Sequence, residues 1–158
     1  MKKSTHKINL EFTFNSERKG AKYTLNGIKW MNGGEFAEVV TKSVLGYEAH
    51  KDANTPYDKG SDLEELNASI KSSRFTLTTT KLGESFNEVI NRYFETVHST
   101  LWIYTVVIED TATLYYMNAD EFKSFLNTFA TFATDRKVIR GKETSVTMIK
   151  WLEDRVEG

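Results

Sequence analysis

The segment Lys59-Gly60-Ser61-Asp62-Leu63-Glu64-Glu65-Leu66-Asn67-Ala68-Ser69-Ile70-Lys71-Ser72-Ser73-Arg74-Phe75-Thr76-Leu77 sets the interpretation of the whole chain. From Ala68 to Leu77, small or polar residues alternate with larger ones, and its β-branched members favour extended backbone. We therefore predict a strand over 68–77, with Asp62 and Lys71 on neighbouring strands of one hairpin joined by a turn at Glu64–Asn67. A carboxylate and an ammonium held together at a sheet edge can bind a divalent cation and orient water beside it.

This arrangement resembles the PD-(D/E)xK nuclease-like superfamily, whose motif is an Asp on one strand and (Asp/Glu)-x-Lys on the next. Ser61 stands at the position of the motif proline, and Ser69 stands at the acidic position two residues before Lys71. A hydroxyl does not supply the negative charge that a hard cation prefers. Family members with Ser-x-Lys take the missing carboxylate from the following helix. The resemblance implies that Glu84, at the predicted start of that helix, is this relocated ligand, with Glu88 one helical turn later as the alternative.

The resemblance also implies the roles of the site residues. Asp62 and Glu84 would bind Mg²⁺ or Mn²⁺ together with the backbone carbonyl of Ile70. Lys71 would orient or deprotonate the attacking water, or neutralise charge that builds up on the phosphate. The activity implied is metal-dependent endonucleolytic hydrolysis of DNA. The predicted phosphate contacts are the basic residues Lys51, Lys59, Lys81, Arg136, Lys137 and Arg140.

The chain is expected to form a single α/β domain over residues 1–158. We predict a restriction-endonuclease-like αβββαβ core with a mixed central sheet over 33–108, preceded by an N-terminal β-hairpin extension over 1–31. A strand and helices follow over 109–158. Within the core, the unbroken apolar run Leu101–Ile108 predicts a central strand with helices on both faces.

The first core helix is predicted to begin after the sequence Asn32-Gly33-Gly34 and to end at Gly46. Glu35 and Glu38 lie on it. Family members often carry a supporting carboxylate here, and Glu35 is taken as the candidate. For Glu38, a favourable charge at the helix N-terminus is the preferred interpretation.

Composition excludes several classes of protein. The 158 residues contain no cysteine, which excludes disulfides, thiolate zinc sites and cysteine nucleophiles. The formal net charge is −1, so bulk charge does not attract nucleic acid, although a local basic face is compatible with it. The N-terminus lacks an apolar signal core and the longest apolar run is too short to span a membrane. We expect a cytoplasmic protein without a membrane partner.

A second interpretation belongs to another functional class. Small, cysteine-free, mildly acidic proteins encoded by phages and mobile elements block host restriction or CRISPR effectors. Ser69 and the net charge of −1 both suit a nuclease-like fold that has lost catalysis and works by binding. The expected partner is then a host defence protein in place of DNA. In either case a homodimer is compatible with the sequence.

Overall fold

A computed structural model of the chain describes residues 1–15, 20–25, 28–31, 36–47, 62–77, 83–133 and 138–157, with residues 10–31 described as backbone only. Four strands come first along the chain, and helices are then interspersed with short runs of strands. In chain order they are β1 (Lys2–Lys7), β2 (Leu10–Asn15), β3 (Gly20–Leu25), β4 (Ile28–Met31), α1 (Phe36–Val44), the 3₁₀ turn η2 (Glu64–Leu66), β5 (Ala68–Lys71), β6 (Thr76–Leu77), α2 (Phe86–Thr96), β7 (Leu101–Ile108), β8 (Thr111–Met117), α3 (Ala119–Phe129), β9 (Ala130–Phe132), β10 (Ile139–Gly141) and α4 (Val146–Asp154).

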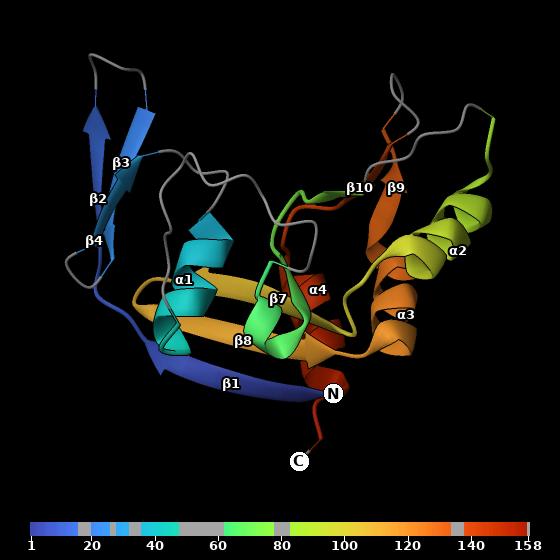
Figure 1. The fold of residues 1–158 in the computed structure, drawn as a ribbon. Coiled ribbons are helices and arrows are strands. Elements are labelled where there is room, and N and C mark those ends of the chain that lie inside the picture. The colour runs from blue at the N-terminus through green and yellow to red at the C-terminus, as the bar shows by residue number, and fades with distance from the viewer. Residues whose placement is uncertain are drawn as a thin grey trace.

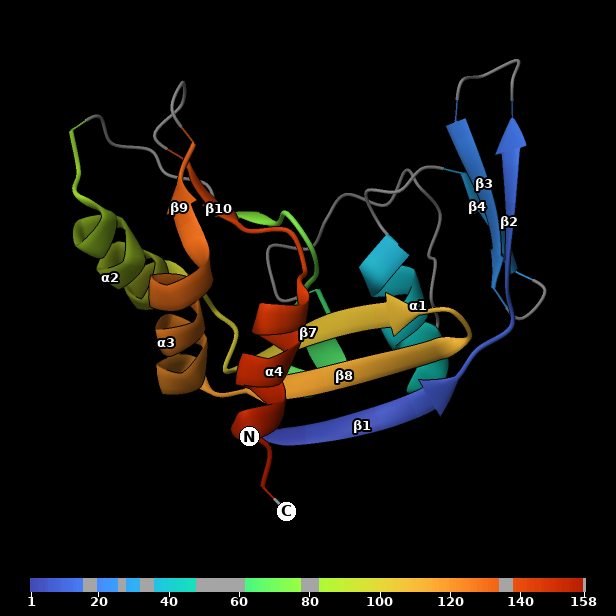
Figure 2. The ribbon, with the colours of Figure 1, turned by 180° about the vertical axis from the view of Figure 1, so that it is seen from behind.

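The main sheet has four strands in the order β1-β8-β7-β5. It is mixed, because β7 runs antiparallel to β8 and parallel to β5. Two three-stranded sheets, β2-β3-β4 and β6-β10-β9, accompany it. In Figure 1 they rise from opposite ends of the main sheet on the same side, and Figure 2 shows the same arrangement from behind.

Strand β7 lies inside the main sheet, as its apolar sequence predicts. Its alternate residues Trp102, Tyr104 and Val106 pack in a core that also contains buried residues of α2, α3 and α4. The intervening Ile103 packs on the opposite face, in a second core that contains buried residues of α1. Helices therefore cover both faces of this strand, and the α/β class with a mixed sheet is confirmed.

The predicted hairpin after Asp62 is present, but the strand that follows it is shorter than expected. Leu63 and Ala68 form an antiparallel bridge around the η2 turn, and Asn67 closes the turn with a left-handed φ of 49°. The prediction of one strand over 68–77 is wrong, because the chain turns after β5 and resumes as β6 in another sheet. The turn has Arg74 at φ 59° and a hydrogen bond from the Phe75 N–H to the Ser72 carbonyl.

The reason for this break lies in Phe75. Its ring contacts the rings of Tyr104, Phe122 and Phe125 at centroid distances of 6.0–6.5 Å. A straight strand would not deliver this ring into the aromatic core between β7 and α3. The packing of this ring among three others stabilises the turned conformation of the chain.

The N-terminal extension is a three-stranded antiparallel meander, β2-β3-β4, in a sheet of its own. The predicted hairpin extension over 1–31 includes β1, but β1 belongs to the main sheet. Strand β1 pairs with β8 there, over the register from Lys2 opposite Tyr116 to Lys7 opposite Thr111.

The helix boundaries follow the capping signals in the sequence. Ser85 and Asn118 form capping boxes with Glu88 and Glu121, and Ser145 caps α4. At the end of α1, Gly46 adopts φ +80°, and the N–H groups of Gly46 and Tyr47 bond to carbonyls of the last helical turn. Within the described parts of the chain, no helix is long and apolar enough to cross a membrane.

Gly141 on β10 offers a direct test of the aromatic packing around Phe75. A Cβ at this position would lie 2.2 Å from Cε1 of Phe75, whose ring is held among three others. Gly141→Ala is expected to lower the free energy of unfolding by about 1–3 kcal/mol, the usual cost of overpacking. Urea denaturation measures this, with the exposed neighbour change Arg140→Ala as control.

The double variant Gly141→Ala/Phe75→Leu should lose less stability than the two single changes added together, because the smaller side chain removes the clash. A Gly141→Ala protein within about 0.5 kcal/mol of wild type would contradict the packing described for Phe75.

Candidate functional site

The candidate site is built around β5, which carries hydrogen bonds on both of its edges. One edge pairs in parallel with β7. On the other edge, the N–H of Leu63 donates to the Ala68 carbonyl at 2.9 Å and the N–H of Ala68 donates to the Leu63 carbonyl at 3.0 Å. Backbone groups repeat every second residue along a strand, so the N–H and C=O of Ile70 point to the same edge as those of Ala68.

Asp62 lies at this outer edge. Its Oδ2 accepts a hydrogen bond of 2.8 Å from the N–H of Ile70. The bond fixes the carboxylate beside the Ile70 peptide, whose carbonyl faces the same edge. The Asp62 carboxylate and the Ile70 carbonyl therefore lie along the same outer edge of β5.

Lys71 ends β5 and is half-buried. Burial of its ammonium lowers the pKa of Lys71, and the negative charges of Asp62 and Glu38 act against that shift. The Nζ atom also lies 5.9 Å from the ring centroid of Phe75. The structure thus brings together the predicted pair of Asp62 and Lys71, and adds Glu38 from the first turn of α1.

Ser69 and the residues around it form a buried polar network behind the site. Its hydroxyl lies 2.6 Å from the hydroxyl of Ser99, and both residues are buried. The Nε1–H of Trp102 donates to the hydroxyl of Tyr93 at 2.9 Å. Burial raises the pKa of Tyr93, against hydrogen bonds with Trp102 and Ser69, and the charge of Asp62 raises it further. The position of the missing motif acid is therefore part of an interior network.

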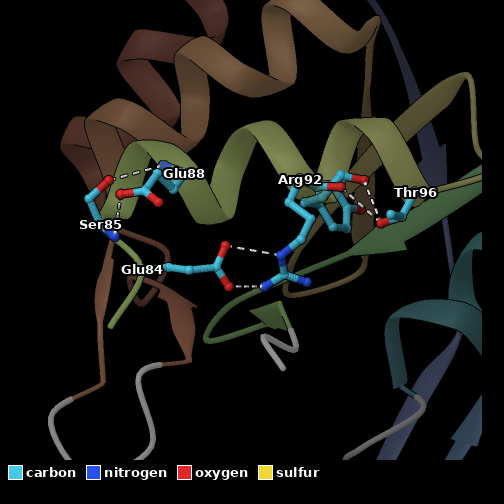
Figure 3. A network of polar contacts seen from close by, with 6 residues as sticks. Glu84, Ser85, Glu88, Arg92 and Thr96 are labelled. Atoms are coloured by element: carbon cyan, nitrogen blue, oxygen red, sulfur yellow. Dashed lines mark hydrogen bonds and ion pairs between the residues drawn. The ribbon is translucent and has the colours of Figure 1, made fainter. Parts of the chain in front are cut away.

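Glu84 lies just before α2 and forms a two-pronged ion pair with Arg92. Its Oε2 accepts from Arg92 Nε at 3.0 Å, and its Oε1 accepts from Arg92 Nη2 at 2.6 Å. Figure 3 shows the two side chains facing each other along the helix. The pair is largely shielded from solvent, with 12% of the Glu84 side chain and 22% of the Arg92 side chain exposed. The hydrogen bond to Glu84 is the largest contribution that raises the pKa of Arg92.

Glu88, the alternative ligand, has a structural role at the same helix start. Its carboxylate accepts a hydrogen bond of 3.2 Å from the N–H of Ser85, as the second half of the capping box. Figure 3 shows it directed toward Ser85 at the start of α2, away from Arg92.

Of the predicted phosphate contacts, Arg140 lies on β10 and is exposed. The other five predicted contacts lie outside the described residues, as does Glu35: they are Lys51, Lys59, Lys81, Arg136 and Lys137. Among the residues that the structure does describe, no group of three or more His, Asp or Glu side chains is placed to hold a metal ion.

Glu38 is the residue of the candidate site that the sequence did not select as a ligand. The available signal was its position on the helix before the hairpin, which the family resemblance associates with a supporting carboxylate. Glu35 and Glu38 lie nearly one turn apart, so spacing alone did not choose between them. Only the packing of α1 against the face of the main sheet that carries Ile70 brings Glu38 toward Lys71.

Comparison of the chain with protein family models, with curated proteins and with solved structures finds no match.

The hydroxyl of Tyr93 is expected to stabilise the buried network. Tyr93→Phe keeps the ring but leaves the Nε1–H of Trp102 without this acceptor, which should cost about 1–3 kcal/mol of unfolding free energy. Thr96→Val, an exposed change on the same helix, is the control. If thermal and urea unfolding of Tyr93→Phe match wild type, the hydrogen bond does not contribute as described.

Proposed function

We propose that the chain is a metal-dependent nuclease that hydrolyses phosphodiester bonds of DNA at the site formed by Asp62, Lys71 and Glu38. The observation that carries this proposal is the hydrogen bond of 2.8 Å by which the Ile70 N–H fixes the Asp62 carboxylate at the edge of the short strand that ends in Lys71. The charges of Asp62 and Glu38 act on the partly buried Lys71 ammonium and oppose the lowering of its pKa. Acidic oxygens next to a lysine on a short strand form the donor set that this chemistry needs.

The oxygen donors at the site match the preference of a hard divalent cation. Carboxylates and backbone carbonyls are the protein ligands that Mg²⁺ and Mn²⁺ take, with water completing the set. Asp62 and the Ile70 carbonyl would hold the cation, as predicted. We assign the second carboxylate to Glu38 in place of Glu84, because Glu84 is engaged by Arg92 through both oxygens.

A bound divalent cation would polarise the scissile phosphate and make water a stronger nucleophile. The residues of the chain supply the rest. Asp62, held by the Ile70 N–H, offers a fixed negative charge and needs little reorganisation. Lys71 donates hydrogen bonds from Nζ, either to the attacking water or to a phosphate oxygen that gains negative charge. Ser69 faces the interior network, so we give it no direct role.

The finer fold proposal is a restriction-endonuclease-like core. It is supported by the order of α1, the Leu63–Ala68 hairpin, α2 and β7, with β5 and β7 parallel across the helix. A parallel pair requires a crossover such as α2. Strand β8 and the terminal strand β1 then extend the sheet beyond that core.

Lys71→Ala is expected to abolish cleavage while the fold is retained. The test incubates plasmid, linear and single-stranded DNA with Mg²⁺ or Mn²⁺, and compares wild type with Lys71→Ala and Lys7→Ala. Lys7 is exposed on β1, and Lys7→Ala removes the same charge as Lys71→Ala at a position away from the site. Lys7→Ala should therefore keep wild-type activity. Circular dichroism checks folding. Wild-type protein that is folded and inert on every substrate would favour the binding-only alternative, with a host defence protein as partner.

The assignment of the second carboxylate is expected to appear in metal binding. In wild type, Mn²⁺ should raise the melting temperature, since a ligand that binds only the native state stabilises it. Asp62→Asn and Glu38→Gln should remove this rise, and Glu84→Gln should keep it. Differential scanning fluorimetry with and without EDTA measures the shift. Loss of the rise in Glu84→Gln, with its retention in Glu38→Gln, would restore Glu84 as the ligand.

A further inference from the structure

One exposed face of the β6-β10-β9 sheet collects basic and hydroxyl side chains. Arg140 of β10 lies opposite Thr76 of β6 and Thr131 of β9, and directly paired residues of antiparallel strands share a face. All three residues are exposed. Their neighbours along the strands, Leu77 and Ile139, are buried in the aromatic core. The sheet therefore has one buried face and one face that is open to solvent.

The same open face continues one step beyond the paired strands. The N–H of Arg74 reaches the carbonyl of Lys142 at 3.5 Å, and the N–H of Gly141 donates to the Phe75 carbonyl at 2.7 Å. Arg74 and Lys142 are both exposed, whereas Gly141 between Arg140 and Lys142 is buried. We call the set of Arg74, Thr76, Thr131, Arg140 and Lys142 the basic face. The exposed carboxylate of Glu143 lies beside this face, 2.9 Å from Arg74.

Arg74 holds its place on this face at a conformational cost. Its φ of 59° lies in the left-handed region, which is unfavourable for a residue with a side chain. Its guanidinium forms an ion pair of 2.9 Å with Glu143, and 69% of the Arg74 side chain and 68% of the Glu143 side chain are exposed. Such an exposed pair contributes little to stability, so a stronger anion can displace the carboxylate.

The basic face lies next to the candidate site along the chain and in space. Arg74 comes three residues after Lys71, and the two are joined only by the turn that follows β5. Strand β6 begins two residues after Arg74 and pairs with β10, so this sheet follows directly on the turn after β5. An elongated polyanion bound at Asp62 and Lys71 would run across this face.

We propose that the basic face binds the phosphate backbone of double-stranded DNA beside the site of hydrolysis. The inference rests on the proposed function in taking DNA as the substrate, and it adds Arg74 and Lys142 as contacts. Arg140 is the exposed residue of β10, and the exposed Lys142 follows directly after that strand, so two positive charges lie within three residues of each other. Threonine hydroxyls also donate to phosphate oxygens. The carboxylate of Glu143 competes with phosphate for Arg74.

Binding without cleavage tests this proposal. Wild type in EDTA is titrated against a fluorescently labelled DNA duplex of about 20 base pairs, at salt concentrations from about 50 to 200 mM. Each of Arg74→Ala, Arg140→Ala and Lys142→Ala should reduce the slope of log K against log[salt] by about 0.9, the value for one phosphate contact. Glu143→Gln should tighten binding, because it removes the competitor for Arg74. Lys7→Ala, which loses an equal charge on β1, should leave the slope unchanged.

The outcomes separate this inference from the proposed activity. Three basic-face variants with the wild-type slope, or a Glu143→Gln protein that binds no tighter, would overturn the basic face even if cleavage is observed. If the slopes change as predicted but the protein never cleaves DNA, DNA binding by the basic face is supported and the proposed nuclease activity is ruled out. Stronger binding to phosphatidylserine vesicles than to the duplex, lost in the same variants, would overturn DNA as the ligand.

Discussion

The arrangement of the site depends on the hydrogen bonds along both edges of β5. This four-residue strand is joined to β7 on one side and to the Asp62–Leu63 segment on the other. The first pairing anchors it in the interior of the domain. The second holds a carboxylate against its backbone, so that Asp62 is positioned by a peptide N–H instead of by flexible side chains. Loss of either edge would separate the acidic and basic groups of the candidate site.

Local signals predicted much of the fold. Continuous apolar residues identified β7, and the observed caps Ser85, Asn118 and Ser145 are of residue types that favour helix starts. The hairpin after Asp62 was also predictable, because its turn is only a few residues long. These features depend on neighbours in the sequence, and such interactions can be read from one chain.

The features that were missed depend on distant contacts. The strand predicted over 68–77 breaks because Phe75 finds its partners on β7 and α3, which come later in the chain. Strand propensity alone does not contain that information. The same holds for Glu38, whose approach to Lys71 follows from the packing of α1, and for Glu84, whose pairing with Arg92 depends on how the chain enters α2.

The pairing of β1 with β8 has a consequence for the order in which the protein folds. Lys2–Lys7 is synthesised more than a hundred residues before its partner strand Thr111–Met117. Such distant pairing closes a long loop and belongs to the slow steps of folding. Until β8 has been made, β1 is unpaired. Its three lysines disfavour pairing with extended segments of other chains during that time. The edge of the finished sheet is thus completed by a strand that is made long before its partner.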